Sequence, residues 1–156
     1  MQPSVNFFPF LAGWEGEELC PYKDQAGIPT IGIGSTFYPN GTKVTMADPC
    51  ITKEQAVEIC QVNLKSFIDE VNEYVKVPIN QNQFDAVLDF TYNEGDGALA
   101  ESTLLKRINA NPSDPTIRDA FMMWVKVKEN GVLVTDSWQV KRRTGDANLY
   151  FTPIVE

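Results

Sequence analysis

The sequence predicts an α+β fold that is mostly helical and has a small antiparallel β-rich lobe near the N-terminus. Two patterns support this expectation. Residues 20–50 combine four glycines with β-branched residues and repeated turn signals, which is typical of short strands joined by tight turns. From Thr52 onward, apolar residues recur at the 3.6-residue period of helices. We therefore expect a single domain over 1–156, with the β-rich lobe over about 22–50 and a helical lobe formed by the remainder.

The first expected elements differ sharply in composition. Apolar residues at helical spacing in 4–19 predict a helix, and Pro9 suits its first turn because the missing N–H has no partner there. The stretch 30–34, which reads TIGIG, predicts a strand. The stretch 38–42, which reads YPNGT, contains the Asn-Gly pair of tight hairpins and predicts a turn.

The strongest helical pattern begins after Thr52. Thr52 and Gln55 form the capping-box signature of a helix start, and the apolar stripe that follows predicts a helix over about 53–75. A second apolar run predicts a helix over 81–93, which ends before the glycines of 95–97. Shorter helices are expected over 102–110, 115–128 and 136–143.

Composition excludes several classes of function. The chain has 13 Lys and Arg, 21 Asp and Glu and no histidine, which gives a formal charge of −8. Without histidine there is no Ser-His-Asp or Cys-His nucleophile and no histidine-ligated metal, so we expect neither metal nor cofactor and assign proton chemistry mainly to carboxylates. The negative charge repels phosphate backbones, and the one basic cluster is Lys141, Arg142 and Arg143, so we expect no nucleic-acid partner.

The cysteines and the N-terminus bear on the compartment. Three cysteines imply no disulfide framework, and we expect reduced thiols in a cytoplasm, with a Cys50–Cys60 bridge as the alternative. The apolar run over 7–14 is too short to span a bilayer, and no basic residue precedes it as a secretory signal requires. We therefore expect a chain in the cytoplasm without a signal peptide, a transmembrane segment or stable membrane insertion. No oligomerisation signal is visible in the sequence, so we expect a monomer.

Two carboxylates near the N-terminus are candidates for catalysis. Glu15 ends the first helix beside Trp14, and Asp24 lies in the turn that leads into the β-rich lobe. Cleavage of a glycosidic bond needs one protonated carboxyl group as acid and a second, ionised one across the bond. Spacing alone is a weak signal, because most of the 21 acidic residues must be solvated surface charges. On that basis equal rivals are Glu17, Glu18 and Asp48.

A longer string of residues gives these two carboxylates more weight. Residues 14–16 (WEG), 22–24 (YKD) and the TIGIG strand closely resemble the phage-type lysozymes, glycoside hydrolase family 24. The signature of that family is Glu, eight residues, Asp, five residues, Thr, and it is matched by Glu15, Asp24 and Thr30. The resemblance continues in the same order through 81–86, 90–93, 102–105, 124–126 and 142–150.

The resemblance implies a lysozyme-like fold and hydrolysis of the β-1,4 bond between N-acetylmuramic acid and N-acetylglucosamine in bacterial peptidoglycan. It implies that Glu15 is the general acid, that Asp24 stabilises positive charge and helps orient a water, and that Thr30 holds that water. Because the family is usually described as inverting, the two carboxyl groups are expected roughly 6.5–9.5 Å apart. Arg143 resembles the family's arginine that pairs with the catalytic Glu.

The resemblance also suggests residues that bind the sugar chain. They fall where family members line the cleft, namely Gly34, Thr36, Tyr92, Asn93 and Ser102. Tyr92 is equally explained as a core residue, and Ser102 as the N-cap of the next helix. The chain departs from many family members at Ser35, where they carry histidine.

These observations favour a phage or prophage endolysin, a muramidase that acts on the glycan strands of peptidoglycan and depends on a holin to reach the wall. Three alternatives remain open: a lytic transglycosylase, which leaves a 1,6-anhydro product; a non-catalytic wall-binding or virion module; and an antibacterial effector. The intact set of Glu15, Asp24 and Thr30 favours hydrolysis over the first two.

Overall fold

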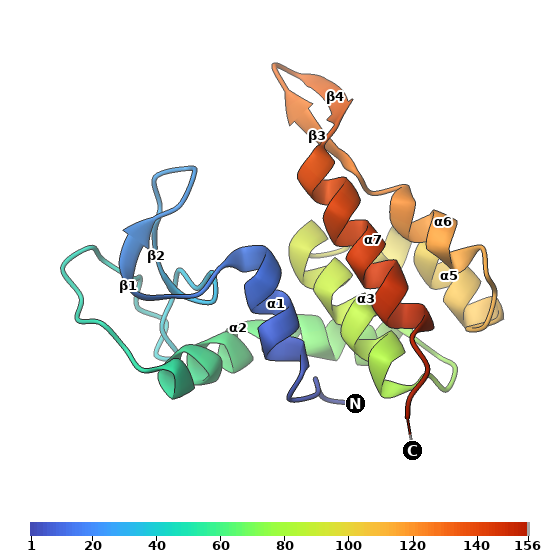
Figure 1. Cartoon of the computed structure of the whole chain (residues 1–156), viewed down its shortest axis with the longest axis horizontal. Helices are drawn as coiled ribbons and strands as arrows, with labels where there is room; N and C mark the ends of the chain where they lie inside the picture. Colours follow the sequence, from blue (N-terminus) through green and yellow to red (C-terminus); the bar gives the residue numbers. More distant parts are fainter. Residues whose placement is uncertain (156) are drawn as a thin grey trace. The chain divides into compact units, whose positions relative to one another are not determined.

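The computed structural model of the chain describes residues 1–155 and is mostly helical, with two small antiparallel hairpins (Figure 1). This confirms the expected α+β class. In chain order the elements are α1 (Phe7–Glu15), β1 (Glu18–Lys23), β2 (Pro29–Gly32), α2 (Lys53–Tyr74), α3 (Gln81–Glu94), α4 (Ala98–Glu101), α5 (Thr103–Ala110), α6 (Ile117–Met122), β3 (Lys126–Glu129), β4 (Val132–Thr135) and α7 (Ser137–Phe151).

The chain forms two compact units that divide within helix α2. One, the β-containing unit, covers 4–66, and the other, the helical unit, covers 1–3 and 67–156. The β-containing unit is wider than the predicted lobe over 22–50, because it also holds α1 and the first part of α2.

Helix α1 and the first hairpin form the start of the β-containing unit. The helix is shorter than predicted, because the chain turns after Glu15 and already begins β1 at Glu18. Buried side chains on α1 are Phe7, Phe8 and Leu11, which explains the helical spacing of its apolar residues. Strands β1 and β2 pair antiparallel, with Tyr22 opposite Thr30.

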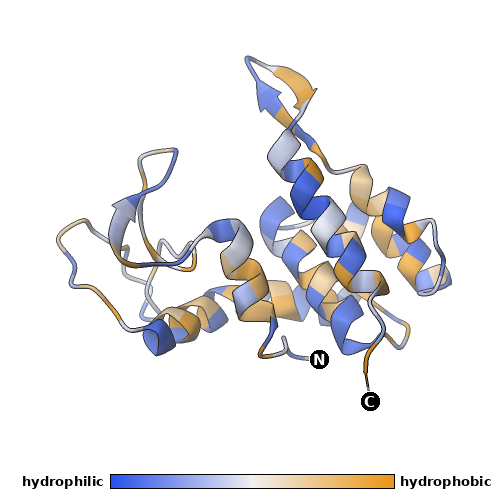
Figure 2. Cartoon of the chain, viewed as in Figure 1, coloured by the Kyte–Doolittle hydropathy of each residue, from blue (hydrophilic) through white to orange (hydrophobic). Residues whose placement is uncertain are grey.

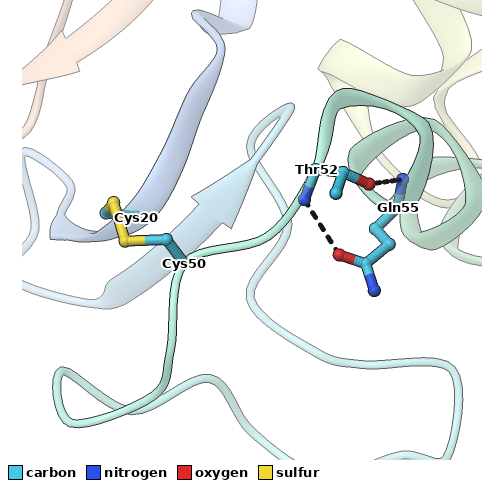
Figure 3. Close-up of a disulfide and its surroundings, with 4 residues drawn as sticks. All are labelled: Cys20, Cys50, Thr52 and Gln55. Atoms are coloured by element: carbon cyan, nitrogen blue, oxygen red, sulfur yellow. Dashed lines mark hydrogen bonds between the residues drawn. A yellow bond between two sulfur atoms is a disulfide. The ribbon is translucent and has the colours of Figure 1, made fainter.

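The prediction of reduced thiols is wrong for two of the three cysteines. Cys20 of β1 and Cys50, in the segment that precedes α2, form a disulfide across a sequence separation of 30 (Figure 3). Cys60 lies on the buried face of α2 and remains a free thiol, so the alternative Cys50–Cys60 bridge is also wrong. Sequence spacing could not find the correct pair, because β1 and the 50s are brought together only by the fold.

The capping box at the start of α2 is present as predicted. The Thr52 hydroxyl accepts a hydrogen bond from the Gln55 backbone N–H at 3.1 Å, and the Gln55 side chain accepts one from the Thr52 N–H at 2.8 Å (Figure 3). These two bonds satisfy donors that would otherwise lack partners in the first turn. The helix that follows buries most of the predicted stripe, including Leu64, Ile68 and Val71.

The helical unit places α3 beside α7, with α6 packed against α7 and α5 against α6 (Figure 1). Helix α3 begins with a second capping box, formed by Asn80 and Gln83, and residues 84–91 of α3 are all buried. Helix α7 is mostly hydrophilic along its length (Figure 2), although it packs against α3. Its inner side therefore carries charged residues as well as apolar ones.

The basic cluster of the sequence is not a surface patch. Lys141 is exposed, whereas Arg142 and Arg143 are buried on α7. Arg142 binds both carboxylate oxygens of Asp89 on α3, at 3.0 and 2.9 Å. Arg143 lies 3.2 Å from a carboxylate oxygen of Asp146, one turn further along α7. Because both arginines are used inside the unit, only one of the three charges faces solvent.

The predicted helix over 115–128 is wrong in its second half. Helix α6 ends at Met122, and the chain then forms the β3–β4 hairpin. Its two-residue turn is Asn130-Gly131, and both residues have positive φ, at 50° and 80°. That backbone matches the twist of paired strands, and Asn-Gly is its strongest sequence signal. The last helix also extends beyond the predicted 136–143, to Phe151.

None of the helices in residues 1–155 is both long enough and apolar enough to cross a membrane.

Candidate active site

Glu15 is the last residue of α1, and its half-buried side chain lies against the backbone of Gly34. Gly34 has a positive φ of 66°. A Cβ atom at this position would lie 3.3 Å from both Cβ and Oε2 of Glu15. The family resemblance suggests that Gly34 binds sugar. In the structure the backbone of Gly34 lies next to the side chain of Glu15. With a side chain at position 34, the side chain of Glu15 would have to shift by a few tenths of an ångström.

Asp24 lies directly after β1 and organises the turn that leads to β2. Its Oδ1 atom accepts hydrogen bonds from the backbone N–H groups of Ala26 and Ile28, both at 2.9 Å. The Asp24 N–H donates to the Ile28 carbonyl at 3.0 Å, which closes the turn. Since both side-chain bonds go to Oδ1, the second carboxylate oxygen of Asp24 is left for other partners.

Thr30 lies on β2 opposite Tyr22 of β1 and is 2% exposed. Its hydroxyl donates to the Ile28 carbonyl at 2.9 Å, so its lone pairs remain able to accept a hydrogen bond from water. Directly opposed residues of an antiparallel pair lie on the same face, and so do residues two apart on one strand. This places Thr30 on the face of the hairpin that carries Tyr22, and Tyr22 lines the same pocket as Asp24.

Glu15 and Asp24 line one pocket of about 480 Å³ in the β-containing unit. Five further residues line this pocket, namely Trp14, Tyr22, Lys23, Gln25 and Ala26. The first three occur in the motifs of the family resemblance without a role of their own, and the last two were not predicted. The signal that could have found Tyr22 is its position two residues before Asp24 in the YKD motif.

Two side chains near the carboxylates of this pocket, Tyr22 and Cys60, have raised pKa values. The pKa of Tyr22 is raised by burial first and then by the negative charges of Glu15, Glu18 and Asp24. Burial, with a contribution from Glu15, raises the pKa of the Cys60 thiol to about 12. The Tyr22 hydroxyl is therefore neutral near these carboxylates, and Cys60 is an unreactive thiol.

The remaining predicted residues lie in the helical unit. Tyr92 is half-buried and makes an edge contact with Phe67, and Asn93 accepts a short hydrogen bond from Arg143. Ser102 is buried, donates to the Leu99 carbonyl at 2.7 Å and accepts from the Leu105 N–H at 3.0 Å. These bonds make Ser102 the N-cap of α5, as its alternative explanation expected.

Arg143 has three polar neighbours within its own unit. Besides Asn93 and Asp146, it lies 4.0 Å from Glu94, and its guanidinium stacks over the Phe90 ring at 5.2 Å. Burial raises the pKa of Glu94 and the two arginines lower it, with burial the larger effect. The expected pairing of Arg143 with Glu15 stays a prediction. Thr36, the last predicted binding residue, is half-buried in the β-containing unit.

The chemistry open to this pocket is acid–base catalysis by carboxylates. Among residues 1–155 no group of three or more Cys, Asp or Glu side chains could hold a metal ion. A pair of carboxylates is the set of groups that hydrolysis of a glycosidic bond uses.

Comparison with known proteins identifies related chains. A model of the phage lysozyme family matches residues 12–145. The endolysin of Salmonella phage P22 is 39% identical over 126 residues, which cover 81% of this chain and 85% of the relative.

Two solved structures share the fold across almost the whole chain. An endolysin from Escherichia coli O157:H7 phage FAHEc1 has a TM-score of 0.90 and 38% identity, and the match covers 97% of this chain and 94% of that one. A mutant of P22 lysozyme has a TM-score of 0.84 and 35% identity, and the match covers 97% and 99% of the two chains. The lysozyme-like fold expected from the sequence is confirmed.

Proposed function

The chain belongs to the phage lysozyme family and is a phage peptidoglycan hydrolase of the lysozyme type, and from this premise we propose that it hydrolyses the β-1,4 bond between N-acetylmuramic acid and N-acetylglucosamine with inversion. Glu15, Asp24 and Thr30 carry the reaction. The observation that supports this assignment most directly is that Glu15 and Asp24 line one pocket, while the Thr30 hydroxyl on β2 donates its proton to the Ile28 carbonyl and keeps its lone pairs for a water.

In this mechanism Glu15 is the general acid. Its carboxyl group donates a proton to the bridging oxygen as the bond to the anomeric carbon breaks, which avoids expelling an alkoxide. Gly34 keeps the backbone close beneath the Glu15 side chain, so the carboxyl group has little freedom to move away from the bond. A fixed donor lowers the entropy cost of the proton transfer.

Asp24 and Thr30 act on the other side of the sugar. The carboxylate of Asp24 stabilises the positive charge that develops on the ring and accepts a hydrogen bond from the attacking water. The turn bonds from Ala26 and Ile28 hold Oδ1, which orients Oδ2 as the reactive oxygen. Thr30 accepts a second hydrogen bond from the same water, because its own proton is used by Ile28.

The test is digestion of purified peptidoglycan by the wild-type chain and by Glu15→Gln. The amide keeps the shape of the side chain but has no acidic proton, so we expect release of reducing ends to fall by at least about 100-fold. Asp24→Asn is the companion variant, because its amide oxygen can still accept both turn bonds while the charge is lost. Activity that survived in Glu15→Gln would remove Glu15 from the role of acid.

Product analysis tests the reaction type in the same digest. A hydrolase leaves reducing muramic acid, whereas a lytic transglycosylase leaves a 1,6-anhydro sugar that is lighter by one water. Proton NMR of the first product formed reports the anomeric configuration, and α product from the β bond is expected for inversion. Initial β product would exclude inversion.

For the biological setting we propose a monomer that is made in the host cytoplasm and reaches the wall with the help of a holin. The Cys20–Cys50 disulfide is favoured in the oxidising space beyond the bacterial inner membrane, where the substrate lies. Expression of the chain alone and together with a holin tests this dependence. Rapid lysis by the chain alone would contradict it.

A further inference from the structure

A second concavity lies next to the catalytic turn in the β-containing unit. Its volume is about 360 Å³, and it shares no lining residue with the pocket of Glu15 and Asp24. The residues that line it are Ile28, Pro29, Thr36, Phe37, Lys43 and Val44. We call it the side pocket. Ile28 belongs to the Asp24 turn, so one short turn carries both the candidate catalytic carboxylate and a wall of the side pocket.

The walls of the side pocket are apolar and accessible. Val44 is 3% exposed, whereas Ile28 and Phe37 are 48% and 43% exposed. A single exposed apolar residue on a surface needs no explanation, but a concavity lined by several of them is typical of a ligand site. Its hydrophobic surface is therefore available to methyl groups of a ligand.

Hydrogen bonds to the backbone fix the segment 36–44, which carries four of the residues that line the side pocket. Phe37 pairs with Lys43 in an antiparallel bridge, and the Val44 N–H donates to the Thr36 carbonyl at 2.9 Å. The side chain of Asn63, on α2, donates to the Phe37 carbonyl at 3.2 Å. The aromatic ring and the lysine therefore start from fixed backbone positions, which reduces the entropy cost of binding.

One positively charged side chain, that of Lys43, lines the side pocket. Lys43 is exposed, and the structure of residues 1–155 gives it no carboxylate partner. The carboxylate of Asp48, on the same loop, accepts hydrogen bonds from Thr45 and Tyr38. In a chain with a formal charge of −8, an unpaired lysine beside exposed apolar side chains matches a ligand that carries a carboxylate next to small apolar groups.

We propose that the side pocket binds the peptide attached to the muramic acid of the substrate, with a peptide carboxylate on Lys43 and alanine methyl groups against Phe37 and Ile28. This rests on the proposed function, because it assumes that the muramic acid sugar lies at Asp24. The Asp24 backbone N–H lies 3.0 Å from the carbonyl of Ile28, which lines the side pocket, and three extended peptide residues span about 10 Å. The side pocket would then select glycan that still carries its peptides.

The experiment compares two substrates made from one preparation. Intact peptidoglycan is digested beside the same glycan after an amidase has removed its peptides, and kcat/KM is measured on both. For Lys43→Gln and for Phe37→Ala we expect the preference for peptide-bearing over peptide-free glycan to fall about 5- to 10-fold. Lys53→Gln, which removes the same charge from an exposed position of the same unit, should leave the preference unchanged.

Each other result overturns the proposal. Equal losses on both substrates would assign the side pocket to sugar binding or to stability, and thermal unfolding of each variant separates these two. An unchanged preference in both variants would show that the peptide does not enter the side pocket. Failure of the proposed function is seen separately, because it leaves Glu15→Gln active on either substrate.

A direct binding measurement supports the kinetic one. The inactive Glu15→Gln chain is titrated with a muramic acid sugar that bears an alanine–glutamate dipeptide, and with the same sugar without peptide. The dipeptide should tighten binding, and Lys43→Gln in the same background should cancel that gain. Equal affinity for the two sugars would exclude a peptide site.

Discussion

The two units of this chain are stabilised internally in different ways. The β-containing unit relies on a disulfide between two exposed cysteines and on backbone bonds within its turns, such as those that Asp24 accepts. The helical unit relies on packed helices that enclose charged groups, with Arg142 bound to Asp89 and Arg143 beside Asp146. One unit is cross-linked at its surface, and the other encloses charged side chains in its interior.

The difference follows from what each kind of segment can bury. Helices satisfy their own backbone groups, so α3 and α7 can pack closely and even enclose charges that are paired. Turns expose their backbone and bury few side chains, so a lobe made of turns needs a cross-link or side-chain bonds to hold one conformation. The candidate catalytic groups Asp24 and Thr30 lie within the stretch that the disulfide closes, from Cys20 to Cys50.

The largest loss of stability is expected when a buried charge in the helical unit loses its partner. Arg142→Met leaves Asp89 buried without its partner, which should lower the free energy of unfolding by about 3–5 kcal/mol, as measured by urea denaturation. The double variant Arg142→Met with Asp89→Leu replaces both charges by apolar groups and should recover most of the loss. A double variant as unstable as the single one would mean that packing, not an uncompensated charge, causes the effect.

Breaking the cross-link of the β-containing unit should cost slightly less. Closing a loop of about 30 residues restricts the unfolded chain, and its loss in Cys20→Ser with Cys50→Ser should lower the free energy of unfolding by about 3.5 kcal/mol. A reductant should destabilise the wild-type chain and leave the double variant unaffected. Cys60→Ala controls for loss of a thiol outside the disulfide, and equal sensitivity of all chains to reductant would contradict the prediction.

Gly34→Ala sharpens the comparison by testing a contact at the candidate active site. The positive φ should cost about 1–2 kcal/mol of stability, and the new Cβ should displace Glu15 and lower kcat by about tenfold or more. Gly41→Ala is a matched control, because Gly41 has a φ of 84° but a Cβ added there would meet no atom within 4 Å. If both variants lost stability and kcat equally, strain rather than contact with Glu15 would be responsible.

The smallest effect is a difference in response to pH. Burial, and next the charge of Asp89, raise the pKa of Asp146, so the folded chain binds that proton more tightly than the unfolded chain. Stability from Asp146 is thus present at low pH and is lost as pH rises above about 4, by at most about 1.4 kcal/mol per pH unit. In the β-containing unit, hydrogen bonds from Thr45 lower the pKa of Asp48. The stability that Asp48 contributes is therefore present at neutral pH and is lost as pH falls below about 4.

Denaturation curves between pH 2 and 7 for Asp146→Asn and Asp48→Asn test these opposite signs. Relative to wild type, Asp146→Asn should flatten the decline of stability above pH 4, and Asp48→Asn should flatten the decline below it. Parallel curves for all three chains would show that neither carboxyl group is linked to folding.

Much of the fold could be predicted from local pattern. The helices that begin at Lys53 and Gln81 are marked by capping residues and a sustained apolar period, and the predicted bounds of both agree with the structure to within one residue at each end. The β3–β4 hairpin is not predicted although Asn130-Gly131 is a strong turn signal, because the preceding apolar residues also suit a helix. The buried state of Arg142 and Arg143 has no local signal, since charged residues are usually exposed.

The sequence by itself determined the helical periods, the glycine-rich lobe, the family resemblance and the candidate set of Glu15, Asp24 and Thr30, because each is written in residues close together along the chain. Only the tertiary structure decided that Cys20 pairs with Cys50, that Gly34 lies against Glu15 and that α7 turns its arginines inward. These features depend on distances between residues far apart in sequence, and such distances are set by packing of the whole chain rather than by any local pattern.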